Sequence, residues 1–135
     1  MDTAAIRNAI RRKVVRISGI DPEKQLMTTG NTFDPLGLDL WCMESVVGGD
    51  VSVISNKRIG STAYLIQYDF CVPVSGDVDA AETMAQRVCS SLLQTGALEV
   101  PGEDCHIRSA RVSGSTGNHF CNFTVLITLG IRSNG

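Results

Sequence analysis

Two segments of the sequence alternate apolar and polar side chains, which is the period of a β-strand with one buried face. In Thr62–Val72 the apolar set is Tyr64, Ile66, Tyr68, Phe70 and Val72. In His119–Ile131 it is Cys121, Phe123, Val125, Ile127, Leu129 and Ile131. Because successive side chains of a strand point to opposite faces, each set lies on one side of a sheet. The chain is therefore predicted to contain a sheet that buries one face.

Two other segments have the 3.6-residue period of helices that bury one stripe of side chains. The first helix can be capped by Asp2 or Thr3, and Gly19 ends it. The second has Asp77 as a favourable N-cap and Gly96 just after its last turn. The first stripe is Ile6, Ile10, Val14 and Ile17, and the second is Ala81, Met84, Ala85, Val88 and Leu92.

Shorter apolar runs bounded by glycine predict the remaining strands. Leu40–Val47 and Val51–Ile54 are expected to form a hairpin across Gly48-Gly49-Asp50, where glycine permits a positive φ. Cys105–Val112 is expected to pair with the second alternating segment across a turn at Gly114–Gly117. Residues 18–38 contain turn signals and no period, so they are expected to be irregular.

The expected order of elements is α-β-β-β-α-β-β. One mainly antiparallel sheet with two helices packed on one face buries all of these apolar sets at once. The fold class is therefore α+β. A chain of 135 residues has the size of one domain, so residues 1–135 are expected to form a single unit with an irregular segment at 18–38.

Charge is distributed unevenly along the chain. The formal net charge is −2, which is too small to steer the whole protein to nucleic acid or anionic lipid. The first helix, however, holds five cations against Asp2, and they are Arg7, Arg11, Arg12, Lys13 and Arg16. Neither interleaved aromatics nor a helix-turn-helix pattern accompany them, which favours a solvated or subunit-facing surface. Binding of phosphates by this surface remains the alternative.

The residues that could carry chemistry do not form a convincing active site. Cys105, His106, His119 and Cys121 have metal-ligating atoms, but the expected hairpin register puts Cys105 and Cys121 roughly 17 Å apart. His119 and Cys121 share a face without an orienting group or an oxyanion hole. The five cysteines include no CxxC pair, so they are expected to be reduced and packed as small apolar side chains. We expect neither an enzyme nor a cofactor or metal, and no apolar stretch is long enough for a membrane span.

The arrangement of motifs resembles the tail-terminator proteins of long-tailed phages, also called tail-completion or minor tail proteins. The resemblance begins at the basic helix Ala4–Ile17 and continues through Thr32-Phe33-Asp34-Pro35, which is similar to the Phe-x-Pro motif before the first strand in that family. It extends over the strand Ala63–Pro73, Gly76, and the helix that opens with Asp79-Ala80-Ala81. A short acidic turn and a closing hairpin complete the pattern.

The resemblance implies a ring, typically a homohexamer, that caps the tail tube, ends tube polymerisation and provides the head-joining surface. Its partners would be the tube protein and a head-tail connector protein, and DNA would pass through the lumen without sequence recognition. The protein would then be in the virion, at the head-proximal end of the tail, after assembly in the host cytoplasm. A head-side neck or stopper protein is the alternative, followed by a small cytosolic ligand-binding domain.

Segments with no evident structural role within a single subunit are the candidates for contacts between subunits of such a ring. They are Phe33–Trp41 and the polar loop Ser55–Thr62. The candidate interface residues are Phe33, Pro35, Leu36, Trp41, Lys57 and Arg58. The candidate basic surface is Arg7, Arg11, Arg12 and Arg16.

Overall fold

The computed structural model describes residues 2–49, 53–54, 59–116 and 120–134. In chain order the elements are α1 (Thr3–Ser18), β1 (Leu26–Met27), β2 (Trp41–Gly49), β3 (Val53–Ile54), β4 (Ile59–Pro73), α2 (Val78–Thr95), β5 (Ala97–Val100), β6 (Glu103–Thr116) and β7 (Phe120–Asn134).

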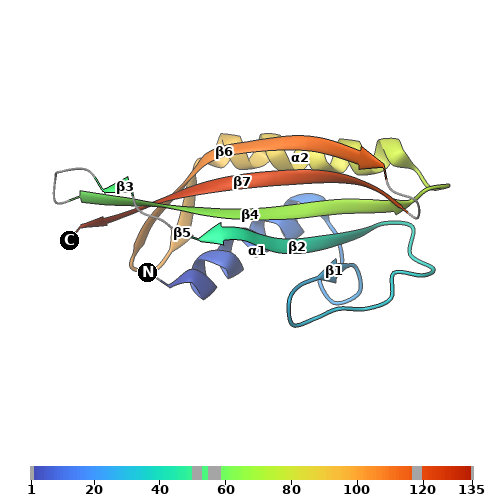
Figure 1. Cartoon of the computed structure of the whole chain (residues 1–135), viewed down its shortest axis with the longest axis horizontal. Coiled ribbons are helices and arrows are strands. Elements are labelled where there is room, and N and C mark those ends of the chain that lie inside the picture. Colours follow the sequence, from blue (N-terminus) through green and yellow to red (C-terminus); the bar gives the residue numbers. More distant parts are fainter. Residues whose placement is uncertain (1, 50–52, 55–58, 117–119, 135) are drawn as a thin grey trace.

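The strands form one sheet, in which β4 and β7 are the central pair (Figure 1). The order across the sheet is β1-β2-β4-β7-β6-β5, and β3 pairs with β4 beside it. Every pairing is antiparallel except that of β1 with β2. The predicted α+β class with one mainly antiparallel sheet is therefore confirmed.

Both helices pack against the same face of the sheet, and in Figure 1 they lie behind it. The alternating apolar residues of β4 and β7 point to this face, which confirms the predicted strand faces; all are buried except Phe123, which is half-buried and packs against the core. The helix stripes meet them: Ile6, Ile10 and Val14 from α1 and Val88 and Leu92 from α2 are fully buried in the same core. The opposite face of the sheet, called the open face below, has no helix over it in the described residues.

The helix ends agree with their predicted caps. The Asp2 carboxylate accepts a hydrogen bond from the Ala5 amide at 3.0 Å, and Gly19 ends α1 with φ +76°. The Asp77 carboxylate accepts from the Ala80 amide at 3.0 Å, and Gly96 ends α2 with φ +70°. Positive φ values suit glycine because it lacks a Cβ.

The sheet has two strands that the sequence did not predict, so the predicted strand order is wrong in detail. β1 has two residues and β5 has four. Neither is long enough to show a period, and both lie at the outer edges of the sheet. β1 falls in the segment expected to be irregular, where a second short pairing joins Thr28 and Asn31.

The expected hairpin between Leu40–Val47 and Val51–Ile54 is also wrong. β2 continues through Gly48 and Gly49, which pair with Leu65 and Tyr64 of β4 after a register shift at Val46. β3 pairs with β4 as well, and β4 begins at Ile59 inside the expected polar loop. The unpaired residue of this irregularity is Val47, and the two glycines lie in the paired strand beyond it, not in a turn.

The final hairpin is longer than predicted, because β6 runs through Gly114 to Thr116. A Cβ on Gly114 would lie 3.0 Å from the Phe123 ring, so this glycine permits close cross-strand packing instead of a turn. Val112 pairs with Val125, and Cys105 pairs with Ile131. Since Ile131 is ten residues along β7 from Cys121, the two cysteines are separated by about 33 Å.

Candidate interaction surface

A tight turn before β2 holds an apolar side chain out into solvent. The Leu38 amide donates to the Pro35 carbonyl at 2.9 Å, and Gly37 between them has φ +92°. The Asp34 carboxylate accepts from the Leu36 amide at 3.0 Å. Leu36 at the tip of this turn is 89% exposed, the largest exposure among the large apolar residues described. Local hydrogen bonds hold the turn in place, and the turn holds the Leu36 side chain in solvent.

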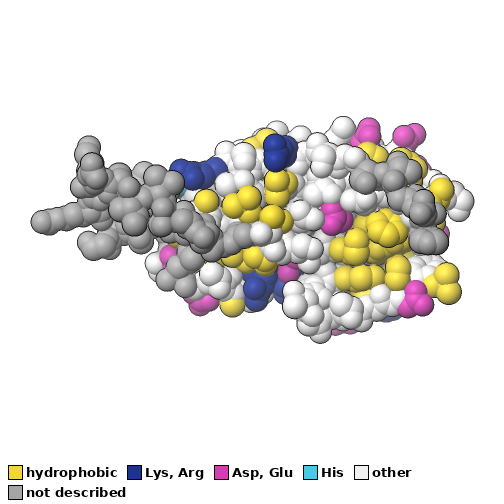
Figure 2. Space-filling model, in the orientation of Figure 1, with side chains coloured by type: hydrophobic (Ala, Val, Ile, Leu, Met, Phe, Trp, Pro, Cys, Tyr) yellow, Lys and Arg dark blue, Asp and Glu magenta, His cyan; other side chains and the backbone are white. Residues whose placement is uncertain are grey.

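The turn lies over one end of the open face and forms a shallow apolar pocket there. The pocket has a volume of about 230 Å³. Trp41 of β2 and Phe120 of β7 meet edge to face in it, with ring centroids 5.9 Å apart. Its apolar lining, called the apolar surface below, is Pro35, Leu36, Leu38, Trp41, Pro73 and Phe120. Figure 2 shows hydrophobic side chains gathered at this end of the open face.

Three of the predicted interface residues, Pro35, Leu36 and Trp41, are brought together on the apolar surface. Phe33 is half-buried and does not line the pocket. Lys57 and Arg58 lie outside the described residues. Sequence reasoning missed Pro73 and Phe120, which face each other across β4 and β7. The only sequence signal for them was their position at the ends of two predicted strands.

A polar network occupies the open face beside the apolar surface. The Asp69 carboxylate is 8% exposed and accepts hydrogen bonds from Gln67 and Asn122, each at 3.3 Å, and from the Thr124 hydroxyl. These donors come from β4 and β7, so the carboxylate ties the two central strands together. With its oxygens engaged in this way, Asp69 has the surroundings of a structural carboxylate.

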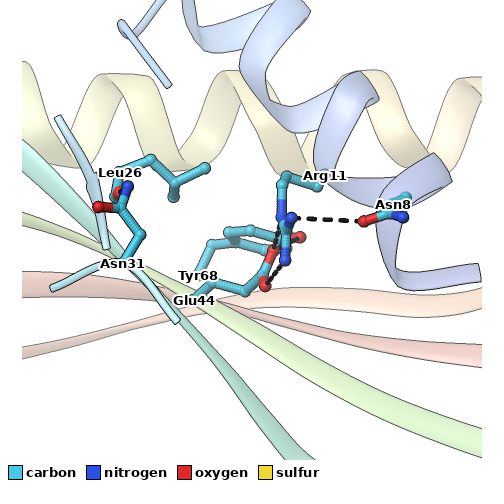
Figure 3. A network of polar contacts seen from close by, with 6 residues as sticks. All are labelled: Asn8, Arg11, Leu26, Asn31, Glu44 and Tyr68. Atoms are coloured by element: carbon cyan, nitrogen blue, oxygen red, sulfur yellow. Dashed lines mark hydrogen bonds and ion pairs between the residues drawn. The ribbon is translucent and has the colours of Figure 1, made fainter. Parts of the chain in front are cut away.

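Arg11, one of the candidate basic residues, points inward (Figure 3). Its guanidinium donates to both carboxylate oxygens of Glu44 in β2, at 2.5 and 2.8 Å, and to Asn8 at 3.3 Å. The Tyr68 hydroxyl donates to the same carboxylate at 2.7 Å. The hydrogen bond to Glu44 raises the pKa of Arg11, and burial beside Glu44 raises the pKa of Tyr68 well above its ordinary value. Arg11 is therefore committed to a contact within the chain.

The other candidate cations remain at the surface. Arg12 and Arg16 are exposed and Arg7 is half-exposed. Arg12 and Arg16 line a cleft of about 440 Å³ together with Lys13, between α1 on one side and the end of α2 and β5 on the other. The sequence predicted the basic surface of α1 but not the cleft, because the cleft requires the packing of β5 beside the helix.

Two buried thiols have strongly raised pKa values. Burial raises the pKa of Cys71 to about 12, with a further contribution from the charge of Asp69. Burial likewise raises the pKa of Cys105 to about 11. A thiol with so high a pKa is protonated at neutral pH and is a poor nucleophile. In the part of the chain that the structure describes, no three metal-ligating side chains are grouped closely enough to hold an ion.

Neither helix, among the residues described, is long and apolar enough to cross a membrane. The sequence matches no family model and no curated protein. Solved structures do match the fold, in 18 chains. One of them aligns over 100% of this chain and 99% of its own length, with a TM-score of 0.73 and 13% identity. Likeness at this identity shows that the two chains share a fold and carries no function with it.

Proposed function

We propose that this chain is a structural virion protein that forms a ring on the phage tail tube. The ring ends tube polymerisation and presents the surface that joins the head. The observation that carries the proposal is the apolar surface, where the two segments most like the tail-terminator family meet. Pro35 belongs to the first segment, and Pro73 ends the second. An exposed apolar surface around a defined pocket suits contact with another protein.

The edges of the sheet also support assembly. In the described residues, β1 pairs with β2 only at Cys42 and Met43, which leaves the rest of β2 with a partner strand on one side alone. This edge carries Val46 and Val47, which are 45% and 51% exposed. Edge strands of monomeric proteins are usually protected by charge or proline. An unprotected edge suits a strand or loop of a neighbouring subunit.

The proposed activity requires neither catalysis nor a cofactor. The homohexamer would contact the tube protein on one side and the head-tail connector protein on the other. DNA would pass through the lumen without sequence-specific binding. The working location would be the head-proximal end of the tail in the virion, reached after assembly in the host cytoplasm.

Deletion of the gene from the phage genome tests this proposal. We expect tails whose tubes exceed the normal length, together with filled heads that lack tails, and expression of the wild-type protein should restore normal particles. Tubes of normal length beside unjoined heads would indicate a head-side neck protein instead. Normal particles without the gene would rule out both roles.

A further inference from the structure

The cleft beside α1, called the basic cleft below, concentrates positive charge. Arg12, Lys13 and Arg16 line it, and Glu99 is the one acidic residue of the lining. No hydrogen bond or ion pair within the described chain engages any of these three cations. Arg12 and Arg16 are four residues apart on one helix, a spacing at which like charges destabilise the helix. An anionic partner in the cleft would relieve this repulsion.

The first turns of α2 carry the opposite charge. Asp77, Asp79 and Glu82, called the acidic end below, are all exposed. The cap role explains Asp77, and the positive end of the helix dipole explains Asp79. Glu82 lies beyond the first turn, where neither explanation applies. No ion pair of the described residues involves Asp79 or Glu82.

The basic cleft and the acidic end lie at opposite ends of the same helix. Thr95, the last residue of α2, lines the cleft. Thirteen residues separate Glu82, the member of the acidic end nearest to the cleft along the helix, from Thr95, which at 1.5 Å per residue is about 20 Å. This is about twice the distance of about 10 Å over which salt screens exposed charges. No ion pair of the described residues joins the two surfaces within one chain, but they can pair between two chains.

We propose that the basic cleft of one copy binds the acidic end of a second copy. The contact joins two different surfaces, so it is heterologous, and repetition of such a contact closes a ring when the rotation between copies permits. Charge complementarity favours a second copy as the occupant, because the cations of the cleft and the carboxylates of Asp79 and Glu82 take part in no ion pair of the described residues. The inference rests on the proposed ring and names the surfaces that join its subunits.

Charge reversal provides the test. The cleft-reversed variant carries Arg12→Glu and Arg16→Glu, and the end-reversed variant carries Asp79→Lys and Glu82→Lys. All four side chains are exposed, so both variants should fold, which circular dichroism checks. Sedimentation at low ionic strength should show self-association weakened by about tenfold or more in each variant alone. Arg87→Glu reverses an exposed cation outside the cleft and should associate like the wild-type protein.

The decisive sample is an equal mixture of the two variants. The cleft-reversed chain is acidic at both surfaces and the end-reversed chain is basic at both, so they should assemble only with each other. The alternating ring then contains equal numbers of the two chains, and it should dissociate as salt is added.

Three results would overturn the inference. In the first, the wild-type protein stays monomeric at low salt up to its solubility limit. In the second, a reversed variant assembles like the wild type. In the third, the mixture of the two folded variants stays monomeric. If the cleft-reversed variant assembles normally but loses binding to duplex DNA, the cleft is a nucleic-acid site. Each of these results is independent of the gene deletion, so a ring that forms as described without acting on tails would contradict only the proposed function.

Discussion

Arg11 and Glu44 bind each other through two hydrogen bonds of 2.5 and 2.8 Å, although 33 residues separate them in the sequence. The Glu44 side chain is 3% exposed and that of Arg11 is 29% exposed, so the pair lies at the boundary of the core. It fixes α1 against β2, and Tyr68 adds a third hydrogen bond from β4. The buried Glu44 carboxylate is therefore stabilised by the hydrogen bonds that Arg11 and Tyr68 donate to it.

Removal of Arg11 alone should destabilise the protein. Arg11→Met leaves the buried Glu44 carboxylate with Tyr68 as its main partner. We expect the free energy of unfolding to fall by about 2–3 kcal/mol. This is less than the full cost of breaking a buried ion pair, because Arg11 is partly exposed. The double variant Arg11→Met, Glu44→Met should recover most of this loss. Urea unfolding measures both, with Arg7→Met as the control on the same helix. Equal effects of Arg11→Met and Arg7→Met would contradict this account.

The core contribution of α2 is tested by two adjacent leucines. Leu92 is fully buried, whereas Leu93 is 49% exposed. Leu92→Ala should lower the free energy of unfolding by about 2–5 kcal/mol because it removes buried surface and leaves a cavity. Leu93→Ala should change it by no more than about 0.5 kcal/mol. Met84→Ala, at a half-buried position, should fall between them. Urea denaturation that ranks Leu93→Ala above Leu92→Ala would show that the helix is rotated.

The long elements were predictable because each has enough residues to show a period and a cap. The buried faces of β4 and β7 and most of the stripe of α2 follow directly from the spacing of their apolar residues. Met84 of the predicted stripe is only half-buried, and Cys89, which the stripe did not include, is buried. The sequence could not predict β1 or β5, because strands of two and four residues depend on pairing with β2 and β6. It also could not distinguish a glycine in a turn from one such as Gly114, whose place is set by the Phe123 ring of the next strand.

Alkaline pH should destabilise the protein through Cys71. Its pKa is about 12 in the folded protein against an ordinary value of 9.0, so the unfolded chain releases this proton first. The contribution of Cys71 to stability is therefore complete below pH 9 and is lost as the pH rises toward 12. Cys71→Ala should lose stability less steeply over this range than the wild-type protein. Parallel slopes in urea unfolding at a series of alkaline pH values would mean that this thiol ionises normally.

The apolar surface can be tested without disturbing the fold. Leu36→Asp changes a side chain that is 89% exposed, so the melting temperature should stay within about 2 °C of the wild type. Binding to isolated tails that lack the protein should nevertheless fall by more than about tenfold, because a charge would replace an apolar contact. Leu93→Asp provides the matched control at an exposed leucine on α2 and should bind normally. Equal binding by the two variants would show that the apolar surface takes no part in the contact with the tail.

The candidate site was only partly predictable from the sequence. Pro35 and Leu36 could be singled out because their turn serves no periodic element, and Trp41 because it follows them. Phe120 and Pro73 join them only through the pairing of β4 with β7, which brings together residues 47 positions apart. Arg11 shows the converse: its position on a basic helix indicated an exposed charge, but the partner that draws it inward lies on β2.

The position of the protein on isolated phage tails decides whether it acts as a tail terminator. Electron microscopy of tails that carry a gold-labelled copy should show label at one end of the tube, the end that joins the head, and averaged images should show a ring there. Label along the tube, label at the opposite end, or tails without label would show that the protein is not a tail terminator.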